Sequence, residues 1–250
     1  MVALIIVGSI LLILLVVYLI EPSLYVLFYS VLTKIFVHNP PYVDVDKYFP
    51  SHQVLKDHWR EIREEVVEIL KNEQAIPKFH EVDNLQRFIS AKDEKAWRTF
   101  ILKGFNKWLP KNCEQVPKTY EYLQQCPEVT LAMFSIIDPG KHIPPHVGFY
   151  KGVFRYHLGI IIPEGDVEIQ VKGIPYRWQE GEEVLFDDTF THQVWNKSDG
   201  KRVVLFLDIF RNDSLPAWIR PINRWMFNIF ANSKKLQEKA RRAEVQRDVA

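Results

Sequence analysis

The chain has 250 residues, 47% of them hydrophobic, and a formal net charge of +1. This length suits one catalytic domain with an additional segment. The near-zero charge argues against a nucleic-acid partner. Two cysteines, Cys113 and Cys126, are too few for a disulfide framework, and they could pair or stay free.

The N-terminal segment is almost purely apolar. No residue from Val2 to Ile20 is charged, and nearly every position is Ile, Leu, Val or Ala. A run of about 20 apolar residues matches the thickness of a bilayer, so we expect a single-pass membrane anchor. A signal peptide fits less well, because no Lys or Arg precedes the run and no small-x-small cleavage site follows it. A buried core helix is disfavoured by the length and the uniform hydrophobicity.

The residues after the anchor stay apolar and aromatic as far as Val37. The stretch Leu24–Val37 predicts an interfacial or half-inserted helix, and the first cation is Lys34. This weak charge signal favours an inner, cytoplasmic membrane with the catalytic domain in the cytosol. The prolines in 38–42 break the helix, and Ser51–Lys71 then predicts one amphipathic helix with Ser51 as its N-cap.

From Val129 onward the pattern changes to short strands separated by turns. We expect strands at 129–137, 154–162, 167–171, 176–178, 183–186, 193–196 and 202–210, with an earlier one at 97–105. Alternation in 154–162 places Arg155, His157 and Gly159 on one face. The pattern predicts a mainly β domain, a sandwich, jelly roll or barrel, with flanking helices. A last helix is predicted over Trp218–Gln246.

Two histidines stand out against this background. His146 lies in PPHVG (144–148), and His192 ends FDDTFTH (186–192). Neutral imidazole is a common ligand of iron, zinc and copper, although a lone histidine is more often a solvated loop residue. Two arginines, Arg155 and Arg202, lie on apolar strands and need anionic partners. Asp187, Asp188 and Asp208 could satisfy them internally, and an anionic cosubstrate is the functional alternative.

Taken together in this order and spacing, these motifs resemble the aspartyl/asparaginyl β-hydroxylase family. The motifs are Ser135, His146-x-Gly148, RYHLG (155–159), FDD (186–188), HQVWN (192–196), Arg202 and Asp208, and the similarity spans roughly 77–211. The family is one of Fe(II)- and 2-oxoglutarate-dependent dioxygenases with a double-stranded β-helix, a jelly-roll or cupin-like fold. In layout the chain is most similar to bacterial lipid A acyl-chain hydroxylases.

The resemblance implies a role for each matched residue. His146 and His192 would bind Fe(II), and Gly148 stands where most 2-oxoglutarate oxygenases have an Asp or Glu ligand. Arg202, helped by Ser135, would bind the distal carboxylate of 2-oxoglutarate, and Arg155 and His157 would hold the metal-proximal carboxylate. Asp187 and Asp188 would orient His192 or brace its turn, with Asp188 as an unusual metal ligand left as an alternative.

The resulting expectation is a membrane-anchored enzyme that uses O2 to hydroxylate an unactivated C–H bond. Four segments are expected: an anchor (1–37), a linker with an amphipathic helix (38–76), the double-stranded β-helix domain (77–213) and a C-terminal amphipathic, charged helix (214–250). The favoured substrate is a lipid A-type acyl chain at a bilayer. A protein Asp or Asn side chain remains the second candidate, and a non-catalytic cupin-like metal-binding scaffold the third.

Overall fold

The computed structural model describes residues 23–82, 95–233, 237–238, 241 and 243–245. The apolar run predicted as a membrane anchor lies outside these residues. Among the helices that are described, none combines the length and apolar character needed to cross a bilayer.

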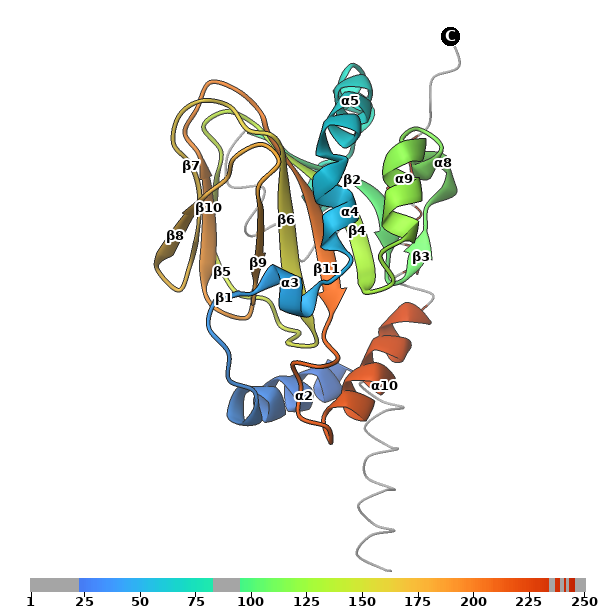
Figure 1. Cartoon of the computed structure of the whole chain (residues 1–250), viewed down its shortest axis with the longest axis vertical. Coiled ribbons are helices and arrows are strands. Elements are labelled where there is room, and N and C mark those ends of the chain that lie inside the picture. Colours follow the sequence, from blue (N-terminus) through green and yellow to red (C-terminus); the bar gives the residue numbers. More distant parts are fainter. Residues whose placement is uncertain (1–22, 83–94, 234–236, 239–240, 242, 246–250) are drawn as a thin grey trace, which may run out of the picture.

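Two antiparallel sheets, packed face to face, form the centre of the described chain (Figure 1). The seven strands of the major sheet are, in spatial order, β1 (Tyr42–Val43), β9 (Glu183–Phe186), β6 (Val153–Ile161), β11 (Arg202–Phe210), β4 (Val129–Ile137), β2 (Trp97–Gly104) and β3 (Lys107–Trp108). The four strands of the minor sheet are β5 (His142–His146), β10 (His192–Asn196), β7 (Val167–Val171) and β8 (Ile174–Arg177). The prediction of a mainly β sandwich with flanking helices is confirmed.

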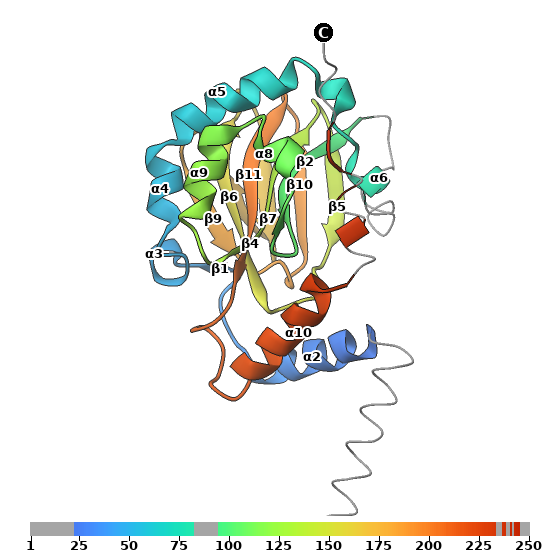
Figure 2. The same ribbon diagram turned by 90° about the vertical axis from the view of Figure 1, so that its right-hand side faces the viewer.

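The two faces of the major sheet have different partners. On one face Tyr156, Leu158 and Ile160 of β6 join a core with α4 (His52–Asp57), α5 (Trp59–Leu70) and α9 (Pro117–Gln124) (Figure 2). Ile62 and Val66 of α5 enter that core at helical spacing. The opposite face meets the minor sheet, and Arg155 and His157 lie there, as the alternation predicts. Every candidate site residue therefore lies between the sheets. Short helices complete the connections: α3 (Val45–Tyr48), η1 (Glu73–Ala75), α6 (Phe79–Val82) and α8 (Pro110–Cys113).

The single helix predicted over Ser51–Lys71 is wrong, because the chain breaks at His58 into α4 and α5. The His58 ring bonds the carbonyl of Val54 at 2.8 Å and stacks on Tyr122 of α9 with ring centroids 4.3 Å apart. Ser51 makes no capping bond to the helix. Its hydroxyl instead donates to Glu128 at 2.5 Å. Tertiary partners of His58 and Ser51 thus override the local helical pattern.

The single helix predicted over Trp218–Gln246 is not continuous, because Ser233 and residues 243–245 lie outside helices. The helix α10 runs from Arg220 to Ala231. Farther along, Asn112 of α8 donates to the carbonyl of Ala243 at 3.1 Å and accepts from the backbone N–H of Val245 at 2.8 Å. These bonds tie 243–245 to α8, whereas the described residues 237–238 and 241 are helical. Both cysteines are free and buried.

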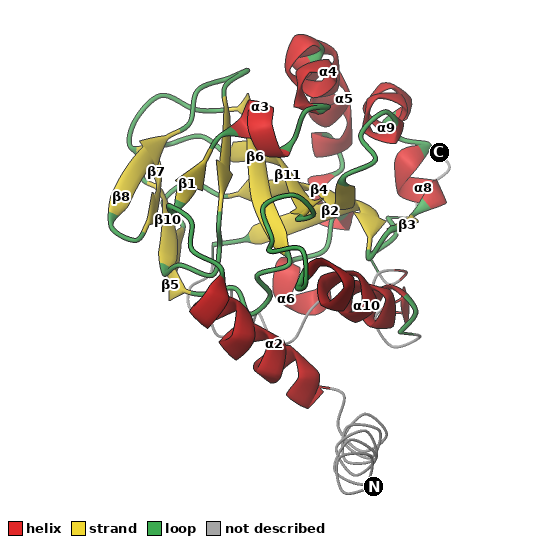
Figure 3. Cartoon of the chain, turned by 60° about the horizontal axis from the view of Figure 1, so that its bottom comes forward, coloured by secondary structure: helices red, strands yellow, loops and turns green. Residues whose placement is uncertain are grey.

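Two helices lie at one end of the sandwich, below it in Figure 1 and side by side in Figure 3. They are α10 and α2 (Ser23–Phe36). A small apolar cluster joins them, made of Tyr29, Val37, Leu215, Ile219 and Met226. The interfacial segment expected over Leu24–Val37 is thus helical, and it packs on the folded domain.

Candidate active site

The two histidines face one another across the edge of the minor sheet. His146 ends β5, His192 begins β10, and the two residues are direct cross-strand partners. Their ring centroids lie 4.0 Å apart. The pattern did not predict β5, since it contains Pro144 and Pro145. Proline is tolerated there because β5 is an edge strand.

Hydrogen bonds fix the same tautomer in both rings. Nδ1 of His146 donates to the carbonyl of Pro144 at 2.8 Å, and Nδ1 of His192 donates to the carbonyl of Phe190 at 3.0 Å. Each Nε2 therefore keeps its lone pair, the form that binds a metal. Burial lowers the pKa of His146 to about 4, with a further contribution from His192, and burial also lowers the pKa of His192. Both rings are neutral at pH 7, so this donor pair fits a divalent metal ion.

A carboxylate fills the space in which residue 148 would have a side chain. A Cβ atom on Gly148 would lie 2.4 Å from both Cγ and Oδ2 of Asp188. The backbone N–H of Gly148 donates to the carbonyl of Asp188 at 2.8 Å. Oδ1 of Asp188 is buried and has no hydrogen-bond partner among the described residues. The same residues show no cluster of three or more His, Cys, Asp or Glu side chains arranged to hold a metal.

Arg155 is neutralised within the protein. Its Nη2 lies 2.7 Å from Oδ2 of Asp188, and its Nε lies 3.0 Å from Oδ1 of Asp208. Its guanidinium carbon also lies 4.2 Å from the centre of the Phe206 ring. Burial raises the pKa of Asp208 to about 6, against the opposing effect of Arg155. The internal pairing considered for the arginines therefore applies to Arg155, which links Asp208 to the Asp188 carboxylate beside Gly148.

Arg202 differs, because it has no carboxylate partner in the described structure. Its side chain is buried, with 1% of the residue exposed. Nη1 donates to Oγ and to the carbonyl of Ser135, both at 3.3 Å, and the guanidinium lies 4.4 Å from the centre of the Trp178 ring. Burial lowers its pKa to about 9. A buried cation held only by neutral groups is a costly arrangement unless an anion completes it.

Polar atoms without partners surround Arg202. Within the described residues, Nε of Arg202, Nε1 of Trp178, Oγ1 of Thr99 and both ring nitrogens of His157 are buried without a hydrogen bond. His157 contacts the Trp178, Phe186 and Phe206 rings. Burial, reinforced by Arg202 and Arg155, holds its pKa well below the ordinary value. These unsatisfied atoms fit a polar, anionic ligand between the sheets.

Three residues of the site, Trp178, Thr99 and Trp97, were not predicted from the sequence. Nε1 of Trp97 donates to Oγ of Ser135 at 3.0 Å, and Thr99 is the β2 neighbour of Ser135. Neither the Trp97 nor the Arg202 contact uses the hydroxyl hydrogen of Ser135. The sequence does carry one signal for Thr99 and Trp97, since both alternate with the apolar residues of β2 that face the helices.

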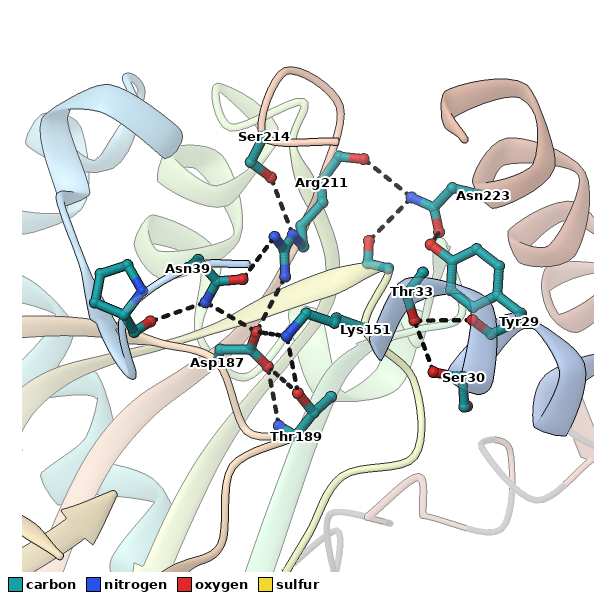
Figure 4. Close-up of polar contacts among 12 residues, drawn as sticks. Tyr29, Ser30, Thr33, Asn39, Lys151, Asp187, Thr189, Arg211, Ser214 and Asn223 are labelled. Carbon is teal, nitrogen blue, oxygen red and sulfur yellow. Dashed lines mark hydrogen bonds and ion pairs between the residues drawn. The ribbon is translucent and has the colours of Figure 1, made fainter. Parts of the chain in front are cut away.

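Asp187 braces the loop that leads to His192 (Figure 4). Its Oδ1 accepts from the backbone N–H and hydroxyl of Thr189, and Oδ2 lies 2.8 Å from Nζ of Lys151 and 3.2 Å from Nη1 of Arg211. Asn39 also donates to Oδ2 at 3.0 Å. Burial alone would raise the pKa of Asp187, but the bonds from Lys151 and Thr189 hold it below its ordinary value. The turn-bracing role expected for Asp187 is thus seen in these contacts.

Asn223 of α10 connects α2 to the loops of the site (Figure 4). Its Nδ2 donates to the carbonyls of Gly152 and Arg211 at 3.1 and 2.9 Å. Its Oδ1 accepts from the hydroxyls of Tyr29 and Tyr150 at 2.8 and 2.5 Å. One fully buried amide therefore satisfies four groups from α2, the β5–β6 loop and the end of β11.

Replacing Asn223 by alanine is expected to destabilise the protein strongly. The change leaves the carbonyl of Arg211 and the hydroxyl of Tyr29 buried without the amide, which costs about 2–4 kcal/mol in free energy of unfolding. The carbonyl of Gly152 keeps the backbone N–H of Arg211, and the hydroxyl of Tyr150 keeps the backbone carbonyl of residue 223. Urea denaturation measures this loss. The matched control is Asn228→Ala, an exposed position on the same helix, which should change stability by less than about 0.5 kcal/mol. Equal effects of the two variants would refute the role given to Asn223.

An apolar pocket lies near this end of the sandwich. Leu131, Val153, Tyr150 and Phe227 line it together with Asp208. Because Asp208 pairs with Arg155, and Arg155 pairs with Asp188, the pocket is separated from the histidines by this chain of ion pairs.

Comparisons with known proteins agree with this geometry. The chain is 37% identical over 193 residues to the ornithine lipid ester-linked acyl 2-hydroxylase of Rhizobium tropici, covering 76% of this chain and 67% of that protein. It is 28% identical over 173 residues to human aspartyl/asparaginyl β-hydroxylase, covering 67% of this chain and 22% of the relative. It is 36% identical over 123 residues to human aspartate β-hydroxylase domain-containing protein 2, covering 46% of this chain and 33% of the relative. The chain thus spans about a third or less of these human proteins.

Solved structures give a weaker likeness. A predicted oxalate decarboxylase from Thermotoga maritima matches 36% of this chain and 73% of its own, with 16% identity and a TM-score of 0.29. The family model described as aspartyl/asparaginyl β-hydroxylase matches residues 56–212, which include both histidines, Ser135, Arg155, His157, Asp187, Asp188 and Arg202. The chain belongs to the aspartyl/asparaginyl β-hydroxylase family.

Proposed function

We propose that this protein is a membrane-anchored, Fe(II)- and 2-oxoglutarate-dependent hydroxylase that acts on an acyl chain of a membrane lipid. The observation that carries the cofactor assignment is Arg202, a buried cation without a carboxylate partner, in the same sandwich as the paired histidines. We assign the sandwich to the double-stranded β-helix class. We also assign residues 2–20 as the anchor, residues 77–213 as the catalytic domain and the bulk of the chain to the cytosolic side of an inner membrane.

His146 and His192 would hold the iron through their Nε2 atoms, since both Nδ1 atoms are engaged by backbone carbonyls. Asp188 would lie on the third side, with its free Oδ1 facing the position that a carboxylate at residue 148 would otherwise take. We propose that Asp188 holds a water molecule in this position and does not bind the metal itself, because its other oxygen is already paired with Arg155.

Arg202 and Ser135 would bind the distal carboxylate of 2-oxoglutarate. The guanidinium gains a charged partner, and Ser135 still has its hydroxyl hydrogen to donate. His157 is neutral and lies between the Arg202 region and Phe186, whose ring centroid lies 5.9 Å from that of His192. We therefore propose that His157 contacts the metal-proximal carboxylate of 2-oxoglutarate. Arg155 shares this side through its charge, while its direct partners are carboxylates of the protein.

Iron and 2-oxoglutarate would together supply the oxidant that places one atom of O2 on an unactivated C–H bond. The protein's own contribution is geometric and electrostatic. The histidines are presented by paired strands, Arg202 is desolvated, and aromatic rings of Trp178, Phe186 and Phe206 exclude water from the interior. This chemistry requires no nucleophilic side chain, and the buried thiols of Cys113 and Cys126 have a raised pKa of about 11 because of their burial.

A lipid acyl chain is the substrate class that we favour, because the apolar side chains of Val147 and Phe149 are exposed in the loop that follows His146. The Rhizobium relative is a lipid acyl hydroxylase by name and aligns with 76% of this chain. Lipid A-type and ornithine-lipid-type acyl chains are both candidates. A protein Asp or Asn side chain is the alternative supported by the human relative, and a non-catalytic metal-binding scaffold is the outcome if no turnover occurs.

Mass spectrometry of membrane lipids from cells with and without the gene distinguishes these substrates. The proposal expects an acyl chain heavier by one oxygen atom only when the gene is present. Unchanged lipids, combined with conversion of 2-oxoglutarate by the purified protein, would favour a protein substrate.

Replacing His146 or His192 by alanine is expected to abolish turnover. A single remaining imidazole cannot hold a divalent metal against water, so Fe(II) affinity should fall by at least about 100-fold, which corresponds to about 3 kcal/mol. Isothermal titration with Co(II) or Fe(II) measures the affinity, and succinate formation measures turnover. His142→Ala is the matched control, because this β5 histidine stacks on Trp195, away from the pair. Normal metal affinity in His146→Ala would disprove the metal assignment.

A further inference from the structure

We propose that α2, Trp218 and α10 form a bilayer-docking face that holds the mouth of the site against the lipid surface. This face, the docking face, is defined by Val31, Lys34, Ile35, Phe36, Trp218 and Trp225. The inference rests on the proposed function in that the substrate is a membrane lipid. It adds the surface by which the folded domain itself meets the membrane, separately from the apolar N-terminal run.

Exposed large apolar side chains are concentrated on this face. The exposed fractions are 51% for Val31, 58% for Ile35, 51% for Phe36, 50% for Trp218 and 45% for Trp225. The rings of Phe36 and Trp218 meet edge to face with centroids 5.1 Å apart, which joins α2 to the segment before α10. Such a patch on a folded domain marks an interaction surface.

The docking face cannot turn inward, because the opposite sides of both helices are already fixed. Tyr29, Thr33 and Val37 of the α2 segment are buried at helical spacing, as are Asn223 and Met226 of α10. Tyr29 donates to Asn223 at 2.8 Å. The apolar residues outside this cluster therefore stay at the surface of the described structure.

The composition of the two helices selects a lipid surface as the occupant. Their sequences contain three cations and no carboxylate. Arg220 is paired with Asp213 of the preceding loop, with Nη1 and Oδ1 3.7 Å apart, whereas Lys34 and Arg224 are exposed. Cations among exposed tryptophans and aliphatic side chains suit anionic headgroups above an acyl region. The chain ahead of α2 continues as the uncharged run Val2–Ile20. A self-associating face would have no need of this charge bias.

The docking face continues to the rim of the site. Oγ of Ser30 on α2 donates to the carbonyl of Phe149 at 2.5 Å. Phe149 is 76% exposed and Val147 is 42% exposed, and both lie in the loop that follows His146. The loop that follows β5 therefore contacts α2 directly. A lipid held on this face would have its acyl chain beside the loop that follows His146.

A fluorescent probe on the full-length protein tests the proposal. Ile35→Cys and Ile174→Cys place a single reactive thiol on the docking face and on β8, at positions with similar exposure, 58% and 49%. The native cysteines are buried, so an environment-sensitive NBD label reports the introduced site. With anionic phosphatidylglycerol vesicles, the probe at residue 35 is expected to shift to the blue and to be quenched at least twofold by doxyl-labelled lipid. The probe at residue 174 should change little.

Each other outcome overturns the inference. Without a blue shift at residue 35, the face does not meet the bilayer. Equal shifts at 35 and 174 show non-specific adsorption. A concentration-dependent shift at 35 without vesicles identifies a second copy of the chain as the occupant. The probe needs no catalysis, so loss of the proposed function leaves this test intact.

A kinetic measurement extends the test to catalysis. The variant Phe36→Ser/Trp218→Ser is expected to raise the KM for vesicle-embedded lipid at least fivefold and to leave turnover of a short, water-soluble acyl substrate unchanged. Equal loss on both substrates would show a structural defect and contradict a docking role. Ile174→Ser is the control for removing an exposed apolar side chain elsewhere.

Discussion

Replacing Arg202 with methionine is expected to weaken 2-oxoglutarate binding about 100-fold and to leave the protein as stable as before or more stable. The guanidinium is buried with no carboxylate in contact among the described residues, and burial lowers its pKa to about 9. Removing an uncompensated buried cation relieves a desolvation cost. Losing a charge-assisted pair costs about 3 kcal/mol of binding, or about 100-fold in Kd. Titration calorimetry and thermal unfolding measure the two effects separately.

Arg211 is the matched control, since it is equally buried but is paired with Asp187 at 3.2 Å. Arg211→Met leaves that carboxylate with less compensation, although Lys151 remains beside it. The free energy of unfolding should fall by about 3 kcal/mol. On the proposed function, Arg202 serves a ligand, whereas Arg211 serves the fold. A large loss of stability in Arg202→Met, with cosubstrate binding intact, would contradict the anion-site assignment.

Introducing the carboxylate that most 2-oxoglutarate oxygenases have at this position is expected to damage the site. In Gly148→Asp the new Cβ would lie 2.4 Å from the carboxyl group of Asp188, closer than real Cβ contacts allow. Two carboxylates would also repel each other at short range. The strand ends that carry the histidines must then shift, and Fe(II) affinity should fall at least tenfold.

A second variant separates crowding from chemistry. Gly148→Asp combined with Asp188→Gly removes the clash and should recover most of the metal affinity lost in the single variant. Fe(II) titration under anaerobic conditions compares the two. Higher affinity in Gly148→Asp alone would show that the third side is open, and that Asp188 does not occupy it.

Much of the site follows from strand alternation. Arg155 and His157 share the face between the sheets because alternate residues of β6 point the same way. The pattern also gives β4, β7, β9 and β11 with their observed bounds. Strong apolar runs between turn residues made these strands predictable.

Other features depend on contacts that no local pattern carries. β5 contains two prolines, and only its position at the sheet edge allows it to be a strand. The break at His58 arises from its bond to Val54 and its stacking on Tyr122, which is far away in sequence. Which of Arg155 and Arg202 lacks a carboxylate partner depends on the side chains that lie within about 3 Å of each guanidinium. From the sequence alone, any of the three aspartates could pair with either arginine.

The close packing of Asp188 against Gly148 could not be predicted for the same reason. An absent side chain suggests a gap in the metal site, whereas the folded chain fills that space from the other loop. The connection of α2 to the active-site loops is likewise a tertiary contact. Asn223 makes it with Tyr29, which is 194 residues away in the sequence.

The most direct test of the central claim is a labelled turnover experiment. The full-length protein in anionic vesicles that contain the candidate lipid is supplied with Fe(II), 2-oxoglutarate and ¹⁸O2, and succinate and lipid hydroxylation are quantified by mass spectrometry. The account predicts O2-dependent succinate formation with one ¹⁸O atom in the acyl hydroxyl group, both lost in His146→Ala. No succinate from any candidate substrate, or turnover that survives His146→Ala, would contradict it.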